Sequence, residues 1–412
     1  MTNMATNIVN RTDLSGLIPE PVTREIIQGV TEGSAVLQMG RRLPNMTSKT
    51  QTMNVLDMLP TAYFVNGDTG MKQTTKMKWD KKKIYAEEIA VIVPIPEAVL
   101  DDADYDIWGE VRPRLVEAFG KVIDGAILFG TNKPTSWRDS VLETCTKAGS
   151  VVAATPYIYD DLLAEGGVIA KVEESGYLVN GIMSAIQMRA KLRGLKDLNG
   201  NPIFKTDMQG ATPYALDGSP MYFPRNGAFD TAKALMFAGD WSELVYSIRQ
   251  DITFKIFDQG VVQDPSDNSI VYNLMQNDMV ALRAVMRLGW EIPNPKTAYN
   301  DTLSKYCPFA VYAPAGTVNT VTVTPATATV AKGASKAFAA AVTGEGAVSN
   351  GVLWSVSGTA AVKAGTKIDE NGTLTIASNE TNTALTVTAT SKQDGTKSGT
   401  CLLYTSTSPR DI

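Results

Sequence analysis

The feature that most constrains this sequence is a long stretch of helical periodicity at residues 101–132, DDADYDIWGEVRPRLVEAFGKVIDGAILFGTN. Apolar side chains recur there at spacings of three and four, which places them on one stripe of a helix with 3.6 residues per turn. These apolar positions are Trp108, Val111, Leu115, Phe119, Val122, Ala126 and Phe129. Charged residues, Asp124 among them, fall mostly between these positions. The pattern therefore predicts one long helix with a single packed face.

Both ends of this helix can be placed from a few residues. Asp104 or Asp106 can cap the first turn, and Gly130 can end the last one. Pro113 lacks the amide hydrogen that would bond back to the preceding turn. We therefore expect either a kink at Pro113 or a helix that begins only near Trp108.

Composition excludes several classes of active site. With no histidine in 412 residues, Ser-His-Asp and Cys-His nucleophile systems and imidazole metal sites are ruled out. The sequence also has no P-loop, no GxGxxG after a strand and no GxSxG. We therefore expect no catalytic residue, cofactor or metal site, although an enzyme based on carboxylates or lysine stays open as a disfavoured alternative.

Charge and length indicate a globular chain of two or three domains. Hydrophobic residues make up 44% of the sequence, and 38 basic against 43 acidic residues give a formal charge of -5. This balance does not call for nucleic acid as a partner. Residues 1–16 have no apolar run typical of a signal peptide, and no segment is long and apolar enough to span a membrane. We expect a chain that is made and used in the cytosol, or that leaves it by a route other than secretion, and that does not interact with a membrane.

The cysteines do not suggest a bridged or metal-bound scaffold. Cys145, Cys307 and Cys401 are odd in number, far apart and outside any CxxC spacing. This pattern argues against a disulfide framework and against a zinc site.

Residues 50–95 change to a period of two and predict a long hairpin. NGDTG at residues 66–70 marks its turn, and Ile89, Val91, Val93 and Ile95 alternate on one face of the returning arm. That arm also carries the candidate intersubunit contacts, which are Lys72, Lys76, Lys78, Trp79, Lys81, Lys82 and Lys83. Basic residues around an aromatic one could bind nucleic acid. A solvated hairpin that meets an acidic surface of another subunit is the favoured interpretation.

The chain after the long helix is mixed. Residues 159–175 and 182–195 have helical patterns, whereas 234–257 and 278–292 contain strand-like runs. Residues 301–317 form a linker rich in proline and turn residues.

The C-terminal part has a different composition. Residues 318–404 contain six or seven short alternating runs bounded by Gly, Asn or Asp, which is typical of an immunoglobulin-like sandwich. Trp354 is its expected core indole, and residues 405–412 are a tail.

The order of these pieces resembles the tailed-bacteriophage major capsid proteins with the Hong Kong ninety-seven (HK97-like) fold. The resemblance lies in five segments in the family's order, at residues 93–131, 177–204, 215–223, 237–259 and 277–292. It implies an α+β fold with a hairpin that lies across a neighbouring subunit. The implied parts are an N-terminal arm (1–49), an extended hairpin loop (50–95), a peripheral domain with the spine helix (96–154), an axial domain (155–235) and returning strands (236–300).

A second resemblance covers residues 318–404. TVTPATATVAKG, VLWSVSG and IDENGTLTI are similar to the bacterial immunoglobulin-like domains of the second group (Big2).

The capsid resemblance has two departures. The arm-like sequence begins by Pro19, where many family members carry a cleaved scaffolding segment, so scaffolding is expected to be separate or absent. The lysine and asparagine that form crosslinks in some members are not matched, so no covalent crosslink between subunits is expected.

These resemblances imply a structural protein and not an enzyme. Copies are expected to assemble into hexamers and pentamers of an icosahedral head around double-stranded DNA, inside the bacterial host cytoplasm. The expected partners are further copies, separate scaffold and portal proteins, packaged DNA through non-specific contacts, and a host-surface or mucosal glycan for the sandwich. One alternative is a cell-surface adhesin or surface-layer protein, disfavoured by the missing signal peptide. The other, a cytosolic enzyme with a carbohydrate-binding appendage, would need a convergent polar pocket.

Overall fold

The structure is a computed structural model that describes residues 33–65, 71–101, 107–196, 214–296 and 306–406, without the side chains of Trp108 and Glu110. It divides into two compact units. Unit 1 comprises Met1–Gly149, Val172–Asp230 and Ala238–Phe309. Unit 2 comprises Ser150–Lys171, Thr231–Phe237 and Ala310–Ile412.

Unit 1 is built on a four-stranded sheet in the order β1-β10-β13-β4. Its strands are β1 (Arg41–Arg42), β10 (Val245–Phe257), β13 (Met279–Glu291) and β4 (Glu87–Pro96). β13 pairs antiparallel with both β10 and β4, and β1 pairs parallel with β10. The strands expected within residues 234–257 and 278–292 are therefore confirmed. Val91 and Val93 lie on the less exposed face of β4 as their alternation predicts.

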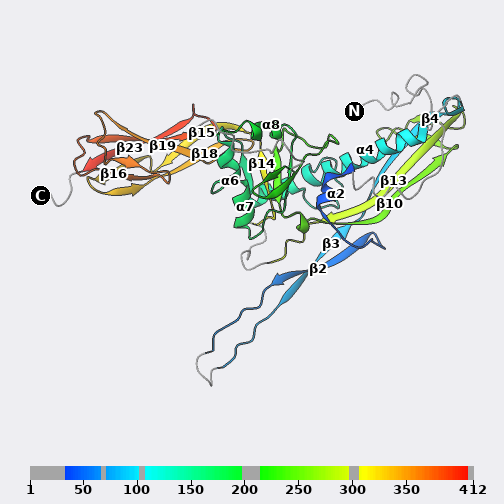
Figure 1. Cartoon of the computed structure of the whole chain (residues 1–412), viewed down its shortest axis with the longest axis horizontal. Helices are drawn as coiled ribbons and strands as arrows, with labels where there is room; N and C mark the ends of the chain where they lie inside the picture. Colours follow the sequence, from blue (N-terminus) through cyan, green and yellow to red (C-terminus); the bar gives the residue numbers. More distant parts are fainter. Residues whose placement is uncertain (1–32, 66–70, 102–106, 197–213, 297–305, 407–412) are drawn as a thin grey trace, which may run out of the picture. The chain divides into compact units, whose positions relative to one another are not determined.

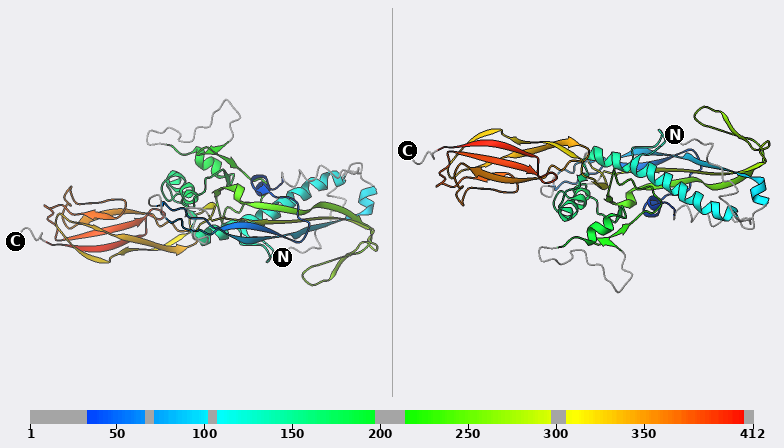
Figure 2. Two further views of the ribbon diagram at one scale, coloured as in Figure 1. Left: turned by 90° about the horizontal axis from the view of Figure 1, so that it is seen from below. Right: turned by 90° about the horizontal axis from the view of Figure 1, so that it is seen from above.

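The long helix is also confirmed. α4 (Ile107–Phe129) is helical on both sides of Pro113, and Ile107 is its first described residue. The expected caps Asp104 and Asp106 lie outside the described residues. α4 runs along one face of the four-stranded sheet in both views of Figure 2, and the Arg112 guanidinium lies over the Phe254 ring of β10 at 5.8 Å.

The packed face of α4 differs from the predicted stripe around Val122. Val122 is 48% exposed, whereas Ile123 and Asp124 are buried. The difference arises because α4 also packs against the segment that leads into α2 (Ala35–Met39). A Cβ on Gly120 would lie 2.2 Å from the Gly33 carbonyl oxygen, so only glycine permits this close approach.

Asp124 joins the two helices through its buried carboxylate. It accepts hydrogen bonds from the Ser34 hydroxyl, from the amides of Ala35 (3.0 Å) and Val36 (3.2 Å), and from the Asn226 side-chain amide (2.7 Å). A carboxylate at a helix N-terminus satisfies amides that have no partner within the helix. Burial raises the pKa of Asp124, although these hydrogen bonds act in the opposite direction.

Several short elements complete unit 1. They are α3 (Glu97–Asp101), α5 (Val141–Ala148), α8 (Met188–Arg193), the 3-10 turn η2 (Trp241–Glu243), and the strands β2 (Thr50–Met58), β3 (Lys78–Tyr85), β6 (Gly181–Ser184), β7 (Ala215–Leu216), β8 (Ser219–Tyr222), β11 (Val261–Gln263) and β12 (Ile270–Asn273). β6 pairs parallel with β8, and β7 pairs antiparallel with β8. The helix expected at residues 182–195 is thus wrong in its first half, because β6 is fully buried and takes its hydrogen bonds from a sheet.

The start of unit 2 shows two further differences from expectation. The helix expected at residues 159–175 is two helices, α6 (Ile158–Leu163) and α7 (Val168–Glu174). A turn at Gly166, where φ is +76°, separates them. The last residues of α7 belong to unit 1. The expected linker at residues 301–317 contains a strand, β14 (Phe309–Ala313), that is buried at every position. β14 pairs parallel with β5 (Val151–Ala153), because five consecutive apolar residues suit a strand buried on both faces.

The C-terminal part of unit 2 is all β. Its strands are β15 (Thr317–Thr324), β16 (Thr327–Ala331), β17 (Ser335–Ala337), β18 (Ala339–Glu345), β19 (Val352–Gly358), β20 (Lys367–Ile368), β21 (Thr373–Thr375), β22 (Ala384–Ser391) and β23 (Ser398–Ser406). They form sheets in the orders β15-β18, β16-β23-β22-β19 and β17-β21-β20. One apolar core, which includes Val323, Phe338, Leu374 and Leu385, lies among them, and the half-buried Trp354 packs against it.

Candidate assembly surface

The hairpin of β2 and β3 is the element of unit 1 that extends furthest from the four-stranded sheet (Figure 1). Its register pairs Thr50 with Tyr85 and Leu56 with Trp79. Beyond the strands, residues 59–65 and 71–77 have no regular secondary structure, and every one of them is exposed. The predicted turn at residues 66–70 lies outside the described residues.

The returning arm is not one continuous strand as the sequence predicts. It ends as β3 at Tyr85 and resumes as β4 at Glu87, and the Ala86 amide between them donates to the Lys49 carbonyl oxygen at 2.9 Å. The Trp137 indole donates to the Tyr85 carbonyl oxygen at 3.0 Å. The base of the hairpin is therefore fixed to unit 1, and only its outer part is free of it.

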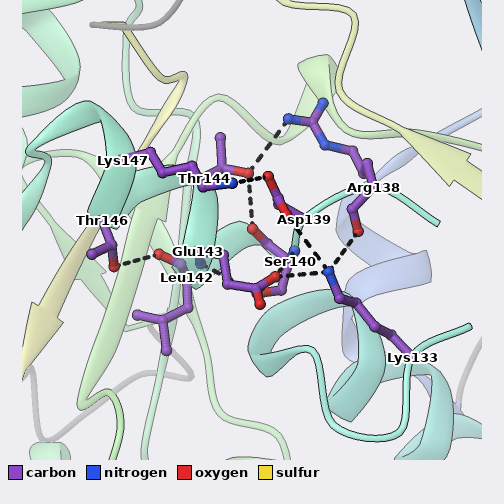
Figure 3. Close-up of polar contacts among 9 residues, drawn as sticks. All are labelled: Lys133, Arg138, Asp139, Ser140, Leu142, Glu143, Thr144, Thr146 and Lys147. Carbon is purple, nitrogen blue, oxygen red and sulfur yellow. Dashed lines mark hydrogen bonds and ion pairs between the residues drawn. The ribbon is translucent and has the colours of Figure 1, made fainter. Parts of the chain in front are cut away.

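The base is held by the loop before α5, and Figure 3 shows its polar contacts. Lys133 lies 2.9 Å from the Glu143 carboxylate, which also accepts from the Ser140 amide at 2.7 Å. These two donors lower the pKa of Glu143 to about 2. Arg138 bonds the Ile292 carbonyl oxygen at 2.8 Å. This network fixes the segment that carries Trp137.

The tip carries exposed apolar side chains on both arms. Phe64 is fully exposed and Met71 is 92% exposed. The remaining exposed apolar residues of the hairpin are Met58, Leu59, Tyr63, Val65, Met77 and Trp79. Apolar side chains gathered on one projecting element are typical of an interaction surface. An isolated hairpin cannot bury them itself.

The predicted basic contacts occupy three different environments. Lys72, Lys76, Lys81 and Lys83 are exposed. Lys78 forms an exposed ion pair with Asp57 at 2.6 Å, which raises the pKa of Lys78 and lowers that of Asp57.

Lys82 points in the opposite direction from its neighbours. Its ammonium donates to the Ile292 carbonyl oxygen at 3.2 Å, and burial lowers its pKa. Lys82 is therefore a contact within the subunit. Reasoning from charge missed the apolar set, although TAYFV at residues 61–65 is a run whose hydrophobicity could have revealed it.

A second exposed apolar set lies around the β11–β12 hairpin. Ile256 is 56%, Val261 50%, Ile270 62% and Met275 73% exposed. Phe257, Val262 and Tyr272 pack beneath against the buried Leu274. The hairpin is therefore a second candidate surface, packed on a small core of its own.

Within the described ranges, no group of three or more carboxylates or cysteines could hold a metal ion. No helix in that part of the chain is long and apolar enough to cross a bilayer.

Comparisons with known proteins identify the N-terminal three quarters of the chain. The model of the Phage capsid family matches residues 15–298. The curated "Major capsid protein" of Staphylococcus phage 80alpha is 26% identical over 292 residues, which are 70% of this chain and 86% of that protein.

Solved structures give the same result. A chain from Microbacterium phage Oxtober96 has 32% identity and a TM-score of 0.60, and the match covers 74% of this chain and 99% of that one. A chain from Mycobacterium phage Adephagia has 31% identity and a TM-score of 0.60 over 75% and 99%. The expected α+β fold of HK97-like capsid subunits is confirmed for the matched part. Because the family model covers more than half of the sequence, the chain belongs to the phage capsid family.

Proposed function

We propose that this chain is a major capsid protein whose copies form the hexamers and pentamers of an icosahedral phage head around double-stranded DNA. The observation that carries the proposal is the exposed apolar tip of the β2–β3 hairpin on a chain of the capsid family. The tip needs a partner surface, and a shell supplies one on every neighbouring copy. Separate scaffold and portal proteins would then guide assembly, and packaged DNA would meet the inner surface without sequence-specific contacts.

Electron microscopy of the purified, expressed protein tests this proposal. We expect closed shells or flat sheets of capsomers. Monodisperse single subunits at every concentration and salt condition would contradict it.

We further propose that residues 318–404 are an immunoglobulin-like domain of the second bacterial group, displayed on the outside of the head. The support is a separate core within this part of the chain and the rhythm of its strands. Outward display follows from crowding, because many such domains inside a head would compete with DNA for volume.

The same domain has a face suited to a neutral ligand. Register places a row of side chains from all four strands of the β16-β23-β22-β19 sheet on its outer face. They are Thr327, Thr329, Leu353, Ser355, Ser357, Thr386, Thr388, Thr390, Ser398, Thr400, Leu402 and Tyr404. None is charged, so a neutral host-surface or mucosal glycan is the proposed ligand, and repeated weak contacts would give avidity.

Retention of assembled particles on an immobilised neutral mucin-type glycan tests this ligand. We expect Tyr404→Ala with Leu402→Ala to abolish retention and exposed Glu370→Ala to leave it unchanged. Equal retention of wild-type particles, of the double variant and of the Glu370→Ala variant would contradict the proposed face.

A further inference from the structure

Two cysteines that are distant in the sequence meet in the core of unit 1. The Sγ atoms of Cys145 and Cys307, which are separated by 162 positions, lie 3.6 Å apart. Both side chains are fully buried. Cys145 comes from α5, and Cys307 lies two positions before the strand β14. The sequence spacing argued against a disulfide, but the fold places the two thiols in van der Waals contact.

The elements that carry the two thiols hold them in this position. A capping box between Ser140 and Glu143 fixes the start of α5. The Cys145 Sγ lies 3.3 Å from the Phe309 carbonyl oxygen, and the Phe309 ring packs edge-on against the buried Trp241 at 5.1 Å between centroids. Each sulfur therefore faces the other across a packed contact, with little freedom to turn away.

Both thiols are buried, so only a small oxidant can reach them. Burial raises the pKa of the Cys145 thiol well above its ordinary value, so this group stays protonated at neutral pH. The contact with Cys145 lowers the pKa of the Cys307 thiol, so Cys307 is the group that supplies the reacting thiolate.

We propose that Cys145 and Cys307 form an intrachain oxidation site, which is a dithiol in the subunit as synthesised and a disulfide in protein exposed to a peroxide. A disulfide has an S–S bond of roughly 2.05 Å. Closing it requires the sulfurs to approach by about 1.5 Å, a distance within reach of small rotations of both side chains.

The reaction balances with one molecule of hydrogen peroxide. One thiolate attacks a peroxide oxygen, the O–O bond breaks, and a sulfenic acid and one water form after proton transfer. The second thiol attacks the sulfenic sulfur, the S–S bond forms, and a second water leaves. The two thiols together lose two electrons and two protons, and the peroxide is reduced to two waters.

The bridge would close a long loop and reduce the number of conformations open to the unfolded chain. It would tie α5 to the segment that leads into β14. Constraining a loop of this length raises the melting temperature, by roughly 5–15 °C for a unit of this size. The third cysteine, Cys401, is buried in the core of the C-terminal strands and is an internal control.

The test uses the purified full-length protein, treated with hydrogen peroxide or left in dithiothreitol, then denatured and alkylated with a maleimide. Mass spectrometry is expected to find one alkylated cysteine, Cys401, after oxidation and three after reduction. Peptide mapping is expected to find Cys145 linked to Cys307. The rise in melting temperature after peroxide is expected in the wild type and in Cys401→Ser, and is expected to be lost in Cys145→Ser and Cys307→Ser.

Three results would overturn the proposal. They are three alkylated cysteines after prolonged oxidation, a linked peptide that contains Cys401, and disulfide-linked dimers on a non-reducing gel. The mass measurement needs no variant, so a serine variant that fails to fold does not prevent the decision. The readout is also independent of shell formation, so its failure would leave the proposed capsid role intact.

Discussion

At the scale of single residues, two carboxylates that a hydrophobic pattern would assign to the surface are buried. Asp124 was expected on the solvent side of the long helix and is 1% exposed, and Glu380 in the C-terminal strands is equally buried. Periodicity counts apolar positions and cannot show that a helix N-terminus some 90 positions away needs an acceptor. Such partners exist only in the folded chain, so the sequence alone could not predict them.

The first prediction concerns the Asp124 network. Asp124→Ala leaves the Ala35 and Val36 amides and the Ser34 hydroxyl without their acceptor in a buried site. We expect a loss of about 2–4 kcal/mol in the free energy of unfolding, because each buried donor left unpaired costs about 1–3 kcal/mol. Thermal or urea unfolding of unassembled subunits measures it. Glu117→Ala, at an exposed position of the same helix, is the control and should change stability by less than about 0.5 kcal/mol.

The second prediction concerns the pH dependence of the C-terminal domain. Burial opposes ionisation of Glu380, but hydrogen bonds from the Asn382 and Lys363 amides and the Thr366 hydroxyl outweigh it and lower the pKa from 4.5 to about 2. The unfolded chain therefore takes up the proton first as pH falls. The stabilisation is complete above the ordinary pKa and is lost as pH falls towards 2.

Calorimetry of the full chain at several pH values checks this sign. Glu380→Gln is expected to cost about 1–3 kcal/mol near pH 6, through donors left unpaired. The difference from the wild type should shrink as pH falls below 4. Exposed Glu370→Gln is the matched control, expected to follow the wild type at every pH. A constant difference from pH 6 to pH 2.5 would contradict the assigned role.

At the scale of elements, long periodic segments were predictable and short buried ones were not. α4, β10 and β13 each present many apolar positions at one period, so their type follows from the pattern. β6 and β14 are four and five residues long and buried at every position. A short apolar run fits a helix, a strand or a linker equally well, and only pairing with β8 or β5 decides its form. The break of the hairpin arm at Ala86 likewise depends on a backbone contact with Lys49.

The third prediction concerns the tip of the β2–β3 hairpin. Phe64→Ser with Met71→Ser removes exposed apolar surface that the subunit itself does not bury. We expect unchanged thermal unfolding of the subunit and at least a tenfold lower yield of shells, measured by sedimentation and electron microscopy. Leu353→Ser, at an exposed position of the C-terminal domain, is the control. Wild-type shell yield from the tip variant would rule out the tip as an intersubunit contact.

A charge variant separates the two kinds of contact at the tip. Lys72→Glu with Lys76→Glu keeps the apolar set and reverses only exposed charges. Lys82 is unsuitable for such a variant, because its bond to the Ile292 carbonyl oxygen stabilises the subunit itself. Lower shell yield from the charge variant alone would indicate an acidic partner surface.

At the scale of the whole molecule, the chain joins a capsid subunit to an addition outside the family match. The match ends at residue 298, whereas β14 and the nine strands after it lie beyond that point. β14 still pairs with β5, which lies inside the matched range, so the fold of the matched part extends past residue 298. The C-terminal strands from β15 onward have a core of their own.

The fourth prediction follows from these two boundaries. A chain ended after Gly316 retains β14 and removes every strand from β15 onward, together with their separate apolar core. Since that core contains only residues beyond Gly316, the rest of the chain keeps its own packing. The shortened chain is therefore expected to fold and form closed, DNA-filled heads in infected cells. A chain ended after Tyr306 is the matched control. It loses β14, leaves β5 without its partner strand, and is expected to be insoluble.

Electron microscopy of heads from the shortened chain, and antibodies to residues 318–404 on intact wild-type particles, give the measurements. Normal heads from the shortened chain and antibody labelling of wild-type particles would establish an external domain that is dispensable for assembly. Labelling follows from outward display, because an intact shell excludes antibodies from anything inside it. Heads that fail to close without these residues would make the domain structural, and unlabelled intact particles would place it inside.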